Sequence, residues 1–338
     1  MGDAVLPQSR MPERTDPVAT ALVSRFRHQR PLRCGSLIIT VFGDAIAPRG
    51  GAITLASLID VMAPFSVTER LVRTSVGRLA ADGWLTSHRF GRLSEYRLSA
   101  SGRAHFADAT RRIYAGPTTA WTGRWTLVLM HGIAAVQRQR IREALRWQGF
   151  GELGTSVLAH PTLTPGEARG ELARLGLADG LIILESQGAD AGENRRLVAD
   201  GWDLRELVAR YLRFVRGFAP VLPAVRGRQR PAPLSAFLVR TLLIHEYRKI
   251  HLRDPLLPPS LLPGDWPGTA AYELCATVYE RVFPAAEAHL AATAARLAGP
   301  LPAADATVYG RFSGLPRTRF AGEAGQCGFA SPVRRISR

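Results

Sequence analysis

The sequence is poor in cysteine and has no long apolar runs. Its three cysteines, Cys34, Cys275 and Cys327, lie far apart in a chain of 338 residues. This spacing favours neither a disulfide framework nor a zinc knuckle and is typical of a reducing cytoplasm. No run of about 18 apolar residues occurs, so we expect neither a membrane span nor a membrane partner. The first residues lack a basic stretch followed by an apolar one, which predicts no secretory signal and a cytoplasmic protein.

Acidic residues and lysine are scarce as well. The chain has 28 acidic residues against 44 basic ones, a net charge of +16, and Lys249 is the only lysine. Such an excess favours polyanionic partners: nucleic acid, acidic membrane surfaces or phosphorylated ligands. Because the chain is also rich in alanine, glycine and proline, the arginine content can instead reflect the base composition of the genome. The position of the arginines must therefore decide between these interpretations.

The length and the hydrophobic fraction of 46% predict two or three domains with apolar cores. Residues 1–33 are polar and aperiodic, and we expect a flexible arm there. The arm carries a basic cluster of Arg25, Arg27, Arg30 and Arg33, and the first three of these could add phosphate or minor-groove contacts with DNA. Helical spacing then begins in residues 36–46, although a β-branched run from Ile38 to Val41 also allows a strand, and continues in a short helix at 55–62.

The segment that follows carries the clearest functional pattern. Ser66 and Glu69 match a capping box, so we predict a helix from 67 to 82 that ends at Gly83. One face of this helix is apolar and belongs to the core: Leu71, Val72, Val76 and Leu79. The opposite face has no acidic partner of its own and carries Arg70, Arg73, Thr74 and Gly77.

Two strand patterns, at 84–90 and 95–98, come next, and a helix at 101–114 closes this first domain, residues 34–116. Two helices, a basic helix and a basic hairpin are the order of a winged helix-turn-helix domain. We therefore expect Arg70, Arg73 and Thr74 to face the major groove of double-stranded DNA. Arg89 and Arg92 on the hairpin should contact phosphates. The alternative is a solvated charged face without a partner.

Two further domains are predicted beyond the linker that begins at Gly116. Residues 122–200 follow the order strand, helix, strand, strand, helix, strand of a ferredoxin-like βαββαβ domain. Residues 201–300 contain amphipathic helices and a proline-rich connection, and form a helical C-terminal domain. Residues 301–338 are polar and basic, which predicts a flexible tail. The expected fold class is α+β and multidomain.

No catalytic motif stands out. His245-Glu246 begins a zinc-protease motif, but Lys249 occupies the position of the second histidine. The first strand of the ferredoxin-like domain, 125–131, offers no carboxylate to a metal ion. We therefore expect no catalytic residues, no metal and no cofactor, and hence no enzyme. The alternative is a metal-dependent nuclease or hydrolase built on the ferredoxin-like domain.

Several segments, in order along residues 30–300, resemble the PaaX family, transcriptional repressors of phenylacetic acid catabolism. They include SLIITVFGDAIAPRGGAITLASLIDVMAP, ERLVRTSVGRLAADGWL, WTGRWTLVL and LLIHEYRKIHLRDPLLPPSLLPGDWPG. The resemblance implies the same three domains, the central one similar to a small CRISPR-associated protein. It also implies a homodimer on a palindromic operator. The effector that it implies is phenylacetyl-CoA or a related acyl-CoA, which releases the protein from DNA.

An acyl-CoA effector has an apolar acyl end and a phosphorylated nucleotide end. The helical C-terminal domain offers aromatic and basic groups of both kinds. The candidate effector-binding residues are Arg240, His245, Arg248, Arg253 and Trp266. The alternative is that these residues are scaffold, with the Arg253-Asp254 pair tying down the proline-rich connection.

Overall fold

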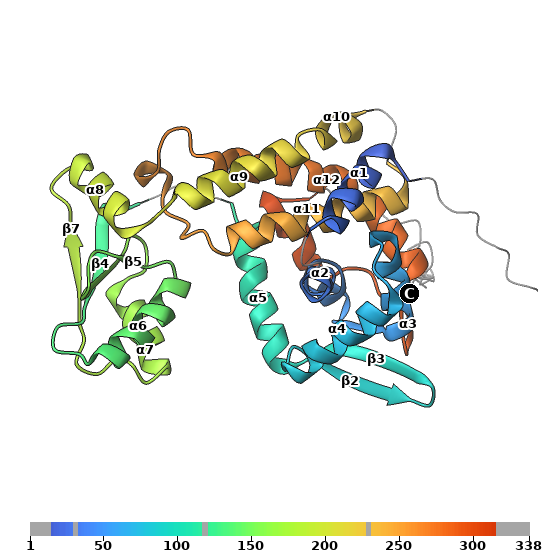
Figure 1. Ribbon diagram of the computed structural model, residues 1–338, viewed down its shortest axis with the longest axis horizontal. Coiled ribbons are helices and arrows are strands. Elements are labelled where there is room, and N and C mark those ends of the chain that lie inside the picture. The colour runs from blue at the N-terminus through green and yellow to red at the C-terminus, as the bar shows by residue number, and fades with distance from the viewer. Residues whose placement is uncertain (1–14, 30–32, 117–120, 228–230, 316–338) are drawn as a thin grey trace, which may run out of the picture.

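The computed structural model describes residues 15–29, 33–116, 121–227 and 231–315. Figure 1 shows a small part with a β-sheet at the left and a larger, mostly helical body at the right. Helical and sheet-containing parts occur together, which confirms a mixed, multidomain α+β architecture. No helix among the described residues is long and apolar enough to cross a membrane.

The helical body is assembled from both ends of the chain. Its first set of helices is α1 (Pro17–Arg27), α2 (Cys34–Val41), α3 (Leu55–Met62), α4 (Glu69–Ala81) and α5 (Ala100–Tyr114). Its second set is α9 (Arg205–Phe218), α10 (Val221–Arg226), α11 (Pro233–His251) and α12 (Pro267–Thr293). Short helical turns join them at Phe42–Ile46, Ala47–Arg49, Ala63–Phe65, Pro259–Leu261 and Ala306–Ser313. One continuous apolar cluster runs through both sets, so the two ends of the chain share a single core.

The expected flexible arm over residues 1–33 is wrong where the structure describes a helix, α1. Asp16 caps this helix by accepting a hydrogen bond from the backbone of Val18, and its own N–H donates to Ser235 on α11 at 2.8 Å. One face of α1 is buried in the body through Ala19, Leu22 and Phe26. The arm folds because these apolar residues, spaced on one helical face, meet a partner surface far away in the sequence. Arg30 lies outside the described residues.

The expected flexible tail over 301–338 is wrong for residues 301–315. Val308, Phe312 and Leu315 are buried in the common core. The Arg311 guanidinium donates to the carboxylate of Asp44, at 2.9 Å, on the first half of the body. Tertiary contacts therefore fix a segment whose local composition is that of a loop. Residues 316–338 lie outside the described part of the chain.

Helix α4 begins two residues later than predicted. The capping box of Ser66 and Glu69 is wrong, because Ser66 ends the preceding turn in a left-handed conformation with φ of 59°. Thr68 is the N-cap instead, and its hydroxyl accepts the Leu71 N–H at 3.3 Å. Glu69 is consequently the first residue of the helix. Gly83 adopts a φ of +76° just beyond the C-terminus, as predicted for a helix stop.

A hairpin of β2 (Leu85–Phe90) and β3 (Leu93–Leu98) follows α4 and projects beside it (Figure 1). The short strand β1 (Ala52–Thr54) pairs with the other edge of β3, so the antiparallel sheet has the order β1-β3-β2. The buried carboxylate of Glu95 accepts the N–H of Leu297 at 2.6 Å. This bond ties β3 to a second hairpin, β8 (Ala295–Arg296) and β9 (Gly299–Pro300).

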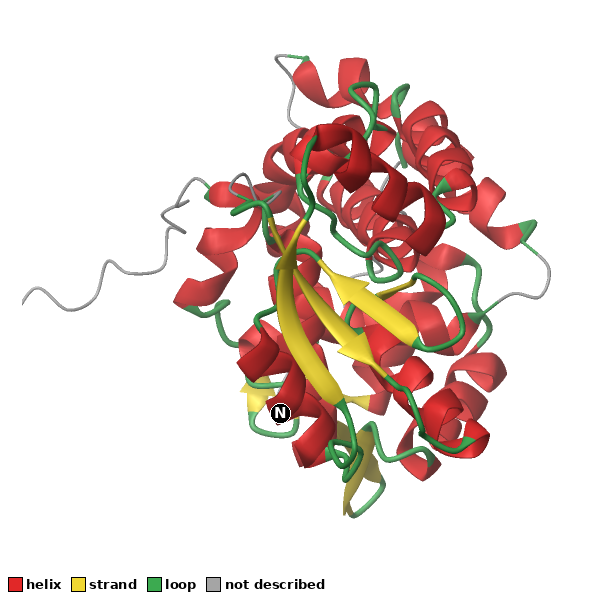
Figure 2. Ribbon diagram, turned by 90° about the vertical axis from the view of Figure 1, so that its left-hand side faces the viewer, coloured by secondary structure: helices red, strands yellow, loops and turns green. Residues whose placement is uncertain are grey.

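The small part contains a four-stranded antiparallel sheet, which Figure 2 views from its open side. Its elements are β4 (Arg124–Leu129), α6 (Ala135–Trp147), β5 (Gly151–Glu152), β6 (Val157–His160), α7 (Pro165–Arg174), β7 (Ile182–Gln187) and α8 (Ala191–Gly201). The strand order is β5-β6-β4-β7, and every pair is antiparallel. Helices α6 and α7 lie on the side of the sheet that faces the helical body (Figure 1).

Candidate nucleic-acid interface and ligand cavities

Helix α4 separates its two faces as the sequence predicts. Val72, Val76 and Leu79 are buried, and Leu71 is half-buried against the core. Arg70, Arg73 and Thr74 are exposed along the opposite face. The Thr74 hydroxyl donates to the Arg70 carbonyl at 2.9 Å, so this side chain lies close to the helix backbone. The two guanidinium groups are therefore the longest polar groups on this part of the face.

The expectation that this face has no acidic partner is wrong for Arg73. Glu69 lies one turn earlier and accepts from the Arg73 guanidinium at 2.7 Å. Both side chains are more than half exposed, and an exposed i,i+4 pair of this kind contributes only about 0.3–0.5 kcal/mol. A stronger anionic partner, such as a phosphate, can therefore displace Glu69 from Arg73.

The same stripe continues to Arg78, which the sequence reasoning missed. Arg78 is exposed and lies four residues after Thr74, hence one turn further along the same face. This four-residue spacing is the sequence signal that could have identified Arg78 as part of the same face. The basic stripe of α4 thus runs from Arg70 to Arg78, about two turns of the helix.

The hairpin carries two of the predicted contacts at its tip. Arg89 and Arg92 are exposed, and they flank two exposed apolar side chains, Phe90 and Leu93, which are opposite each other in the ladder. The hairpin's single acidic residue, Glu95, is buried and pairs with Arg97 at 2.5 Å. The exposed tip is therefore cationic and apolar, without a competing carboxylate.

Two of the five predicted effector residues lie inside the body instead of on a surface. Arg240 is completely buried and pairs with Asp44 at 2.7 Å and with Glu287 at 2.5 Å. His245 is also buried, and its Nδ1 lies 2.9 Å from the hydroxyl of Thr40. Burial holds the pKa of His245 well below its usual value, so the imidazole is neutral.

Arg240 belongs to a buried polar network that joins the two halves of the body. Asp44 accepts hydrogen bonds from the hydroxyls of Tyr114 and Tyr279, at 2.5 and 2.8 Å, and from Arg311. Burial alone would raise the pKa of Asp44, but Arg240 and Arg311 lower it below its usual value. Glu287 also pairs with Arg49. These contacts hold the turn after α2 against α11 and α12.

Arg248 and Arg253 occupy a different environment. The Arg248 guanidinium donates to the Thr40 hydroxyl at 2.8 Å and to the Ser36 carbonyl at 2.6 Å, both neutral partners. Burial lowers the pKa of Arg248 to about 10. Arg253 is exposed and makes no ion pair within the described residues.

Arg248 and Arg253 line one cavity of about 810 Å³, together with Arg33 and Arg213. Trp266 lines another, of about 110 Å³, beside Tyr211. The structure therefore brings two of the five predicted effector residues together and leaves the other three apart.

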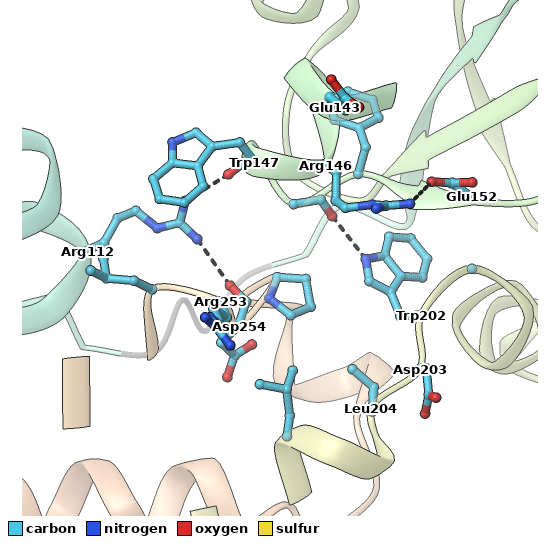
Figure 3. Close-up of a pocket in the computed structure, with 16 residues that line it drawn as sticks. Arg112, Glu143, Arg146, Trp147, Glu152, Trp202, Asp203, Leu204, Arg253 and Asp254 are labelled. Atoms are coloured by element: carbon cyan, nitrogen blue, oxygen red, sulfur yellow. Dashed lines mark hydrogen bonds and ion pairs between the residues drawn. The ribbon is translucent and has the colours of Figure 1, made fainter. Parts of the chain in front are cut away.

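A further cavity, of about 650 Å³, lies between the small part and the body (Figure 3). Arg112 crosses this gap and donates to the carbonyls of Trp147 and Asp254, at 3.2 and 3.1 Å. Trp202 donates to the carbonyl of Gly149 on the other side, at 3.0 Å. The two Arg112 bonds hold Trp147 of the small part against α5 and the segment that follows α11.

Within the described residues, no three His, Cys, Asp or Glu side chains come together as a metal ion requires. His245 is therefore not part of such a cluster in the described chain.

The fold and these surfaces define a multidomain α+β protein with a basic helix and a basic hairpin side by side. Family models match it in three consecutive stretches: PaaX-like protein over 33–102, PaaX protein central Cas2-like domain over 118–198, and PaaX-like protein C-terminal domain over 202–292. The chain is 37% identical over 289 residues to the transcriptional repressor PaaX of Escherichia coli, covering 84% of this chain and 92% of that protein. The chain belongs to the PaaX family.

A solved structure is also similar, that of an uncharacterized protein from Mycobacterium tuberculosis. The sequence identity is 22%, the TM-score is 0.49, and the match covers 74% of this chain and 97% of that one.

Proposed function

We propose that this protein is a DNA-binding transcriptional repressor of aromatic, phenylacetate-type catabolic genes. The observation that carries the proposal is the exposed arginine stripe of α4 beside the cationic hairpin tip. The E. coli relative is named as a transcriptional repressor, which supports the same role here. In this proposal the protein has no enzymatic activity, and its partner is double-stranded operator DNA.

A winged helix-turn-helix domain over residues 34–116 is part of this proposal. In such a domain a third helix enters the major groove and a hairpin wing touches the neighbouring backbone. The order α2, α3, α4 and then the β2–β3 hairpin supports the assignment. A ferredoxin-like domain over 122–200 is supported by the strand order and the antiparallel pairing of its sheet. A helical C-terminal domain over 201–300 is the third of the proposed domains.

In the proposed complex Arg70 and Arg73 reach base edges in the major groove. An arginine that binds guanine through two hydrogen bonds discriminates against other bases by about 1–3 kcal/mol. Thr74 follows Arg73 on the same face, and Arg89 and Arg92 contact phosphates from the wing. Arg25 and Arg27, expected in a flexible arm, lie on α1. Arg25 donates to the Gly217 carbonyl at 2.9 Å, so this side chain helps to hold α1 on the helical body.

The proposed repressor binds as a homodimer to a palindromic site, because a two-fold pair of recognition helices matches two equal half-sites. Its proposed effector is an aryl-CoA thioester such as phenylacetyl-CoA. To weaken operator binding about 100-fold, this ligand must favour the non-binding state by about 2.7 kcal/mol, which is within the usual range of allosteric coupling.

The first test is Arg73→Ala in an operator gel shift. We expect binding to weaken by about 1–3 kcal/mol, because the variant loses one base-edge contact. Arg169→Ala is the control, since Arg169 is exposed on α7 of the small part. Both variants should keep the unfolding midpoint of the parent protein. Operator affinity unchanged in Arg73→Ala would refute the recognition-helix assignment.

Salt provides a second test, because phosphate contacts release counterions from DNA. If about six phosphates are neutralised per dimer, log K should fall against log salt with a slope near −5. Fluorescence anisotropy of a labelled operator between about 50 and 200 mM salt measures this slope. A flat response would show that direct phosphate contacts do not drive binding.

A further inference from the structure

The cavity of about 810 Å³ is strongly basic. It lies between α9 and the C-terminal end of α11 and receives Arg25 and Arg33 from the N-terminal segment. Half of its fourteen lining residues are arginine or lysine, and only one, Glu246, is acidic. Phe214 and Phe218 add aromatic surface to its wall. A wall of this composition suits a ligand with several negative charges.

Several of these cations have no anionic partner of their own. Glu246 pairs with Lys249 at 2.8 Å. Arg33, Arg213 and Arg253 are exposed and make no ion pair within the described residues. Arg248 is the most informative member, because it is largely enclosed and bonded only to neutral oxygens of α2. An anion beside Arg248 would offset the cost of burying its charge.

The neighbouring cavity of about 650 Å³ differs in charge although it is similar in size. It has three arginines, Arg112, Arg146 and Arg253, against four acidic residues, Glu143, Glu152, Asp203 and Asp254. Arg146 is also already paired with Glu152 (Figure 3). Charge therefore separates the two cavities and favours the basic one for a polyphosphate ligand.

A smaller cavity of about 170 Å³ adjoins the basic one. The two share the side chains of Trp147, Arg248 and Leu252. Its other walls are mainly apolar and come from α2, α5 and α11, with Ile39, Phe106, Ile113 and Ile244 among them. An apolar cavity of about 150 Å³ is large enough for benzene, so a phenyl group fits a space of this volume.

We propose that the two adjoining cavities form one effector site. The basic cavity binds the phosphates of an acyl-CoA, and the apolar cavity binds its aryl group, with Arg248 at the junction between them. This inference rests on the proposed function for the class of ligand. It adds where the ligand binds and which cavity holds its phosphates and its aryl group.

The location also connects the ligand to the DNA-binding surface. Helix α5 follows the wing directly in the chain, and α2 packs against the recognition helix α4. Trp147 reaches the same cavity from α6 of the small part. Arg112 on α5 holds that part in place, yet its buried Nε has no hydrogen-bond partner. An aryl group between α5 and α11 would therefore contact α2, which packs against α4, α5, which follows the wing, and Trp147 of the small part.

The basic half is tested with the double variant Arg213→Ala/Arg253→Ala. Arg216→Ala is the matched control, because Arg216 lies three residues along α9 and is exposed outside the cavity. Isothermal titration of the full chain uses phenylacetyl-CoA and free coenzyme A as probes. Loss of charge-assisted hydrogen bonds should weaken both probes about 10-fold to 100-fold in the double variant. The control should bind both as the parent does.

The apolar half is tested with Ala109→Trp, which fills the cavity from α5. Ala107→Trp is the control, since Ala107 is exposed on the same helix. We expect the filled variant to bind phenylacetyl-CoA no more tightly than coenzyme A, and to stay on the operator when the thioester is added. An unfolding curve and operator binding establish that each variant is folded.

The outcomes separate the site from the function. A parent protein that is released by phenylacetyl-CoA, with the double variant and the filled variant released equally well, overturns this site and leaves the proposed function intact. A parent that binds neither the operator nor the thioester overturns the proposed function itself. Weaker thioester binding in both variants, with operator binding kept, supports the site.

Discussion

Two groups of arginines in this protein have the same side chain and opposite environments. Arg70 and Arg73 on α4 are exposed, and the one ion pair between this face and a carboxylate, Arg73 with Glu69, is open to solvent. Arg240 and Arg311 are buried and bind Asp44 across the interface between the two halves of the body. The net charge of +16 therefore combines two kinds of arginine. Only the exposed arginines can exchange their present partner for another anion.

The difference follows from solvation. A charge buried in the core loses its hydration and needs a fixed partner, so removing that partner is costly. An exposed charge keeps its hydration and gains little from an ion pair. Substitutions in the first group should therefore change binding, and substitutions in the second should change folding.

The largest effect is expected for Asp44→Ala. This change leaves Arg240 and Arg311 buried without their carboxylate, which should lower the free energy of unfolding by about 3–5 kcal/mol. Urea denaturation measures the loss, and Asp60→Ala, an exposed aspartate on α3, should stay within about 0.5 kcal/mol of the parent. Equal stabilities for the two variants would contradict a structural role for the network.

A smaller effect on the free energy of unfolding is expected from a change of pH. Exposed arginines stay charged over the range used, whereas buried histidines have lowered pKa values. Burial lowers the pKa of His160 to about 4, against about 6.5 in an unfolded chain. Between these values only the unfolded chain takes up the proton, so stability is complete above pH 6.5 and is lost as the pH falls. From pH 7 to pH 5 this residue should reduce the free energy of unfolding by about 2 kcal/mol.

Urea denaturation of the parent and of His160→Asn at the two pH values isolates this contribution. Asparagine can keep the bonds that the His160 Nδ1 accepts from the backbone of Thr162 and Leu163. The variant should lose less stability on acidification than the parent, whereas equal losses would assign the pH dependence to other groups.

The smallest effect is expected for Glu69→Ala, which tests the exposed group. The change removes a negative charge from the exposed face of α4 and frees Arg73, at a cost to the helix of about 0.3–0.5 kcal/mol. We expect operator binding to become several-fold tighter by fluorescence anisotropy, with little change in the unfolding midpoint. Weaker binding would mean that Glu69 holds Arg73 in its DNA-binding orientation.

Local patterns in the sequence predicted the elements whose signals are local. The two faces of α4, its stop at Gly83 and the basic hairpin all lie within about thirty residues and agree with the structure. The start of α4 was misplaced because Ser66 and Thr68 are both good caps. Only the backbone of the preceding turn decides between them.

The effector residues were less accessible to such reasoning. Arg240 and His245 share helix α11 with Arg248, and their residue types are equally suited to an anionic ligand. Burial distinguishes them, since Arg240 meets Asp44 from 196 positions earlier in the chain and Arg248 meets a cavity. No local pattern encodes which face of α11 is covered.

The sequence by itself determined the helical periods, the turn at Gly83, the basic α4 face and the family. These depend on neighbours a few residues apart and on motifs that follow one another in order along the chain, which three family models match. Only the tertiary structure decided that residues 17–27 and 301–315 are part of the body, and which arginines are buried. The physical reason is that burial depends on contacts between segments about 200 residues apart, and the two ends of this chain share one core.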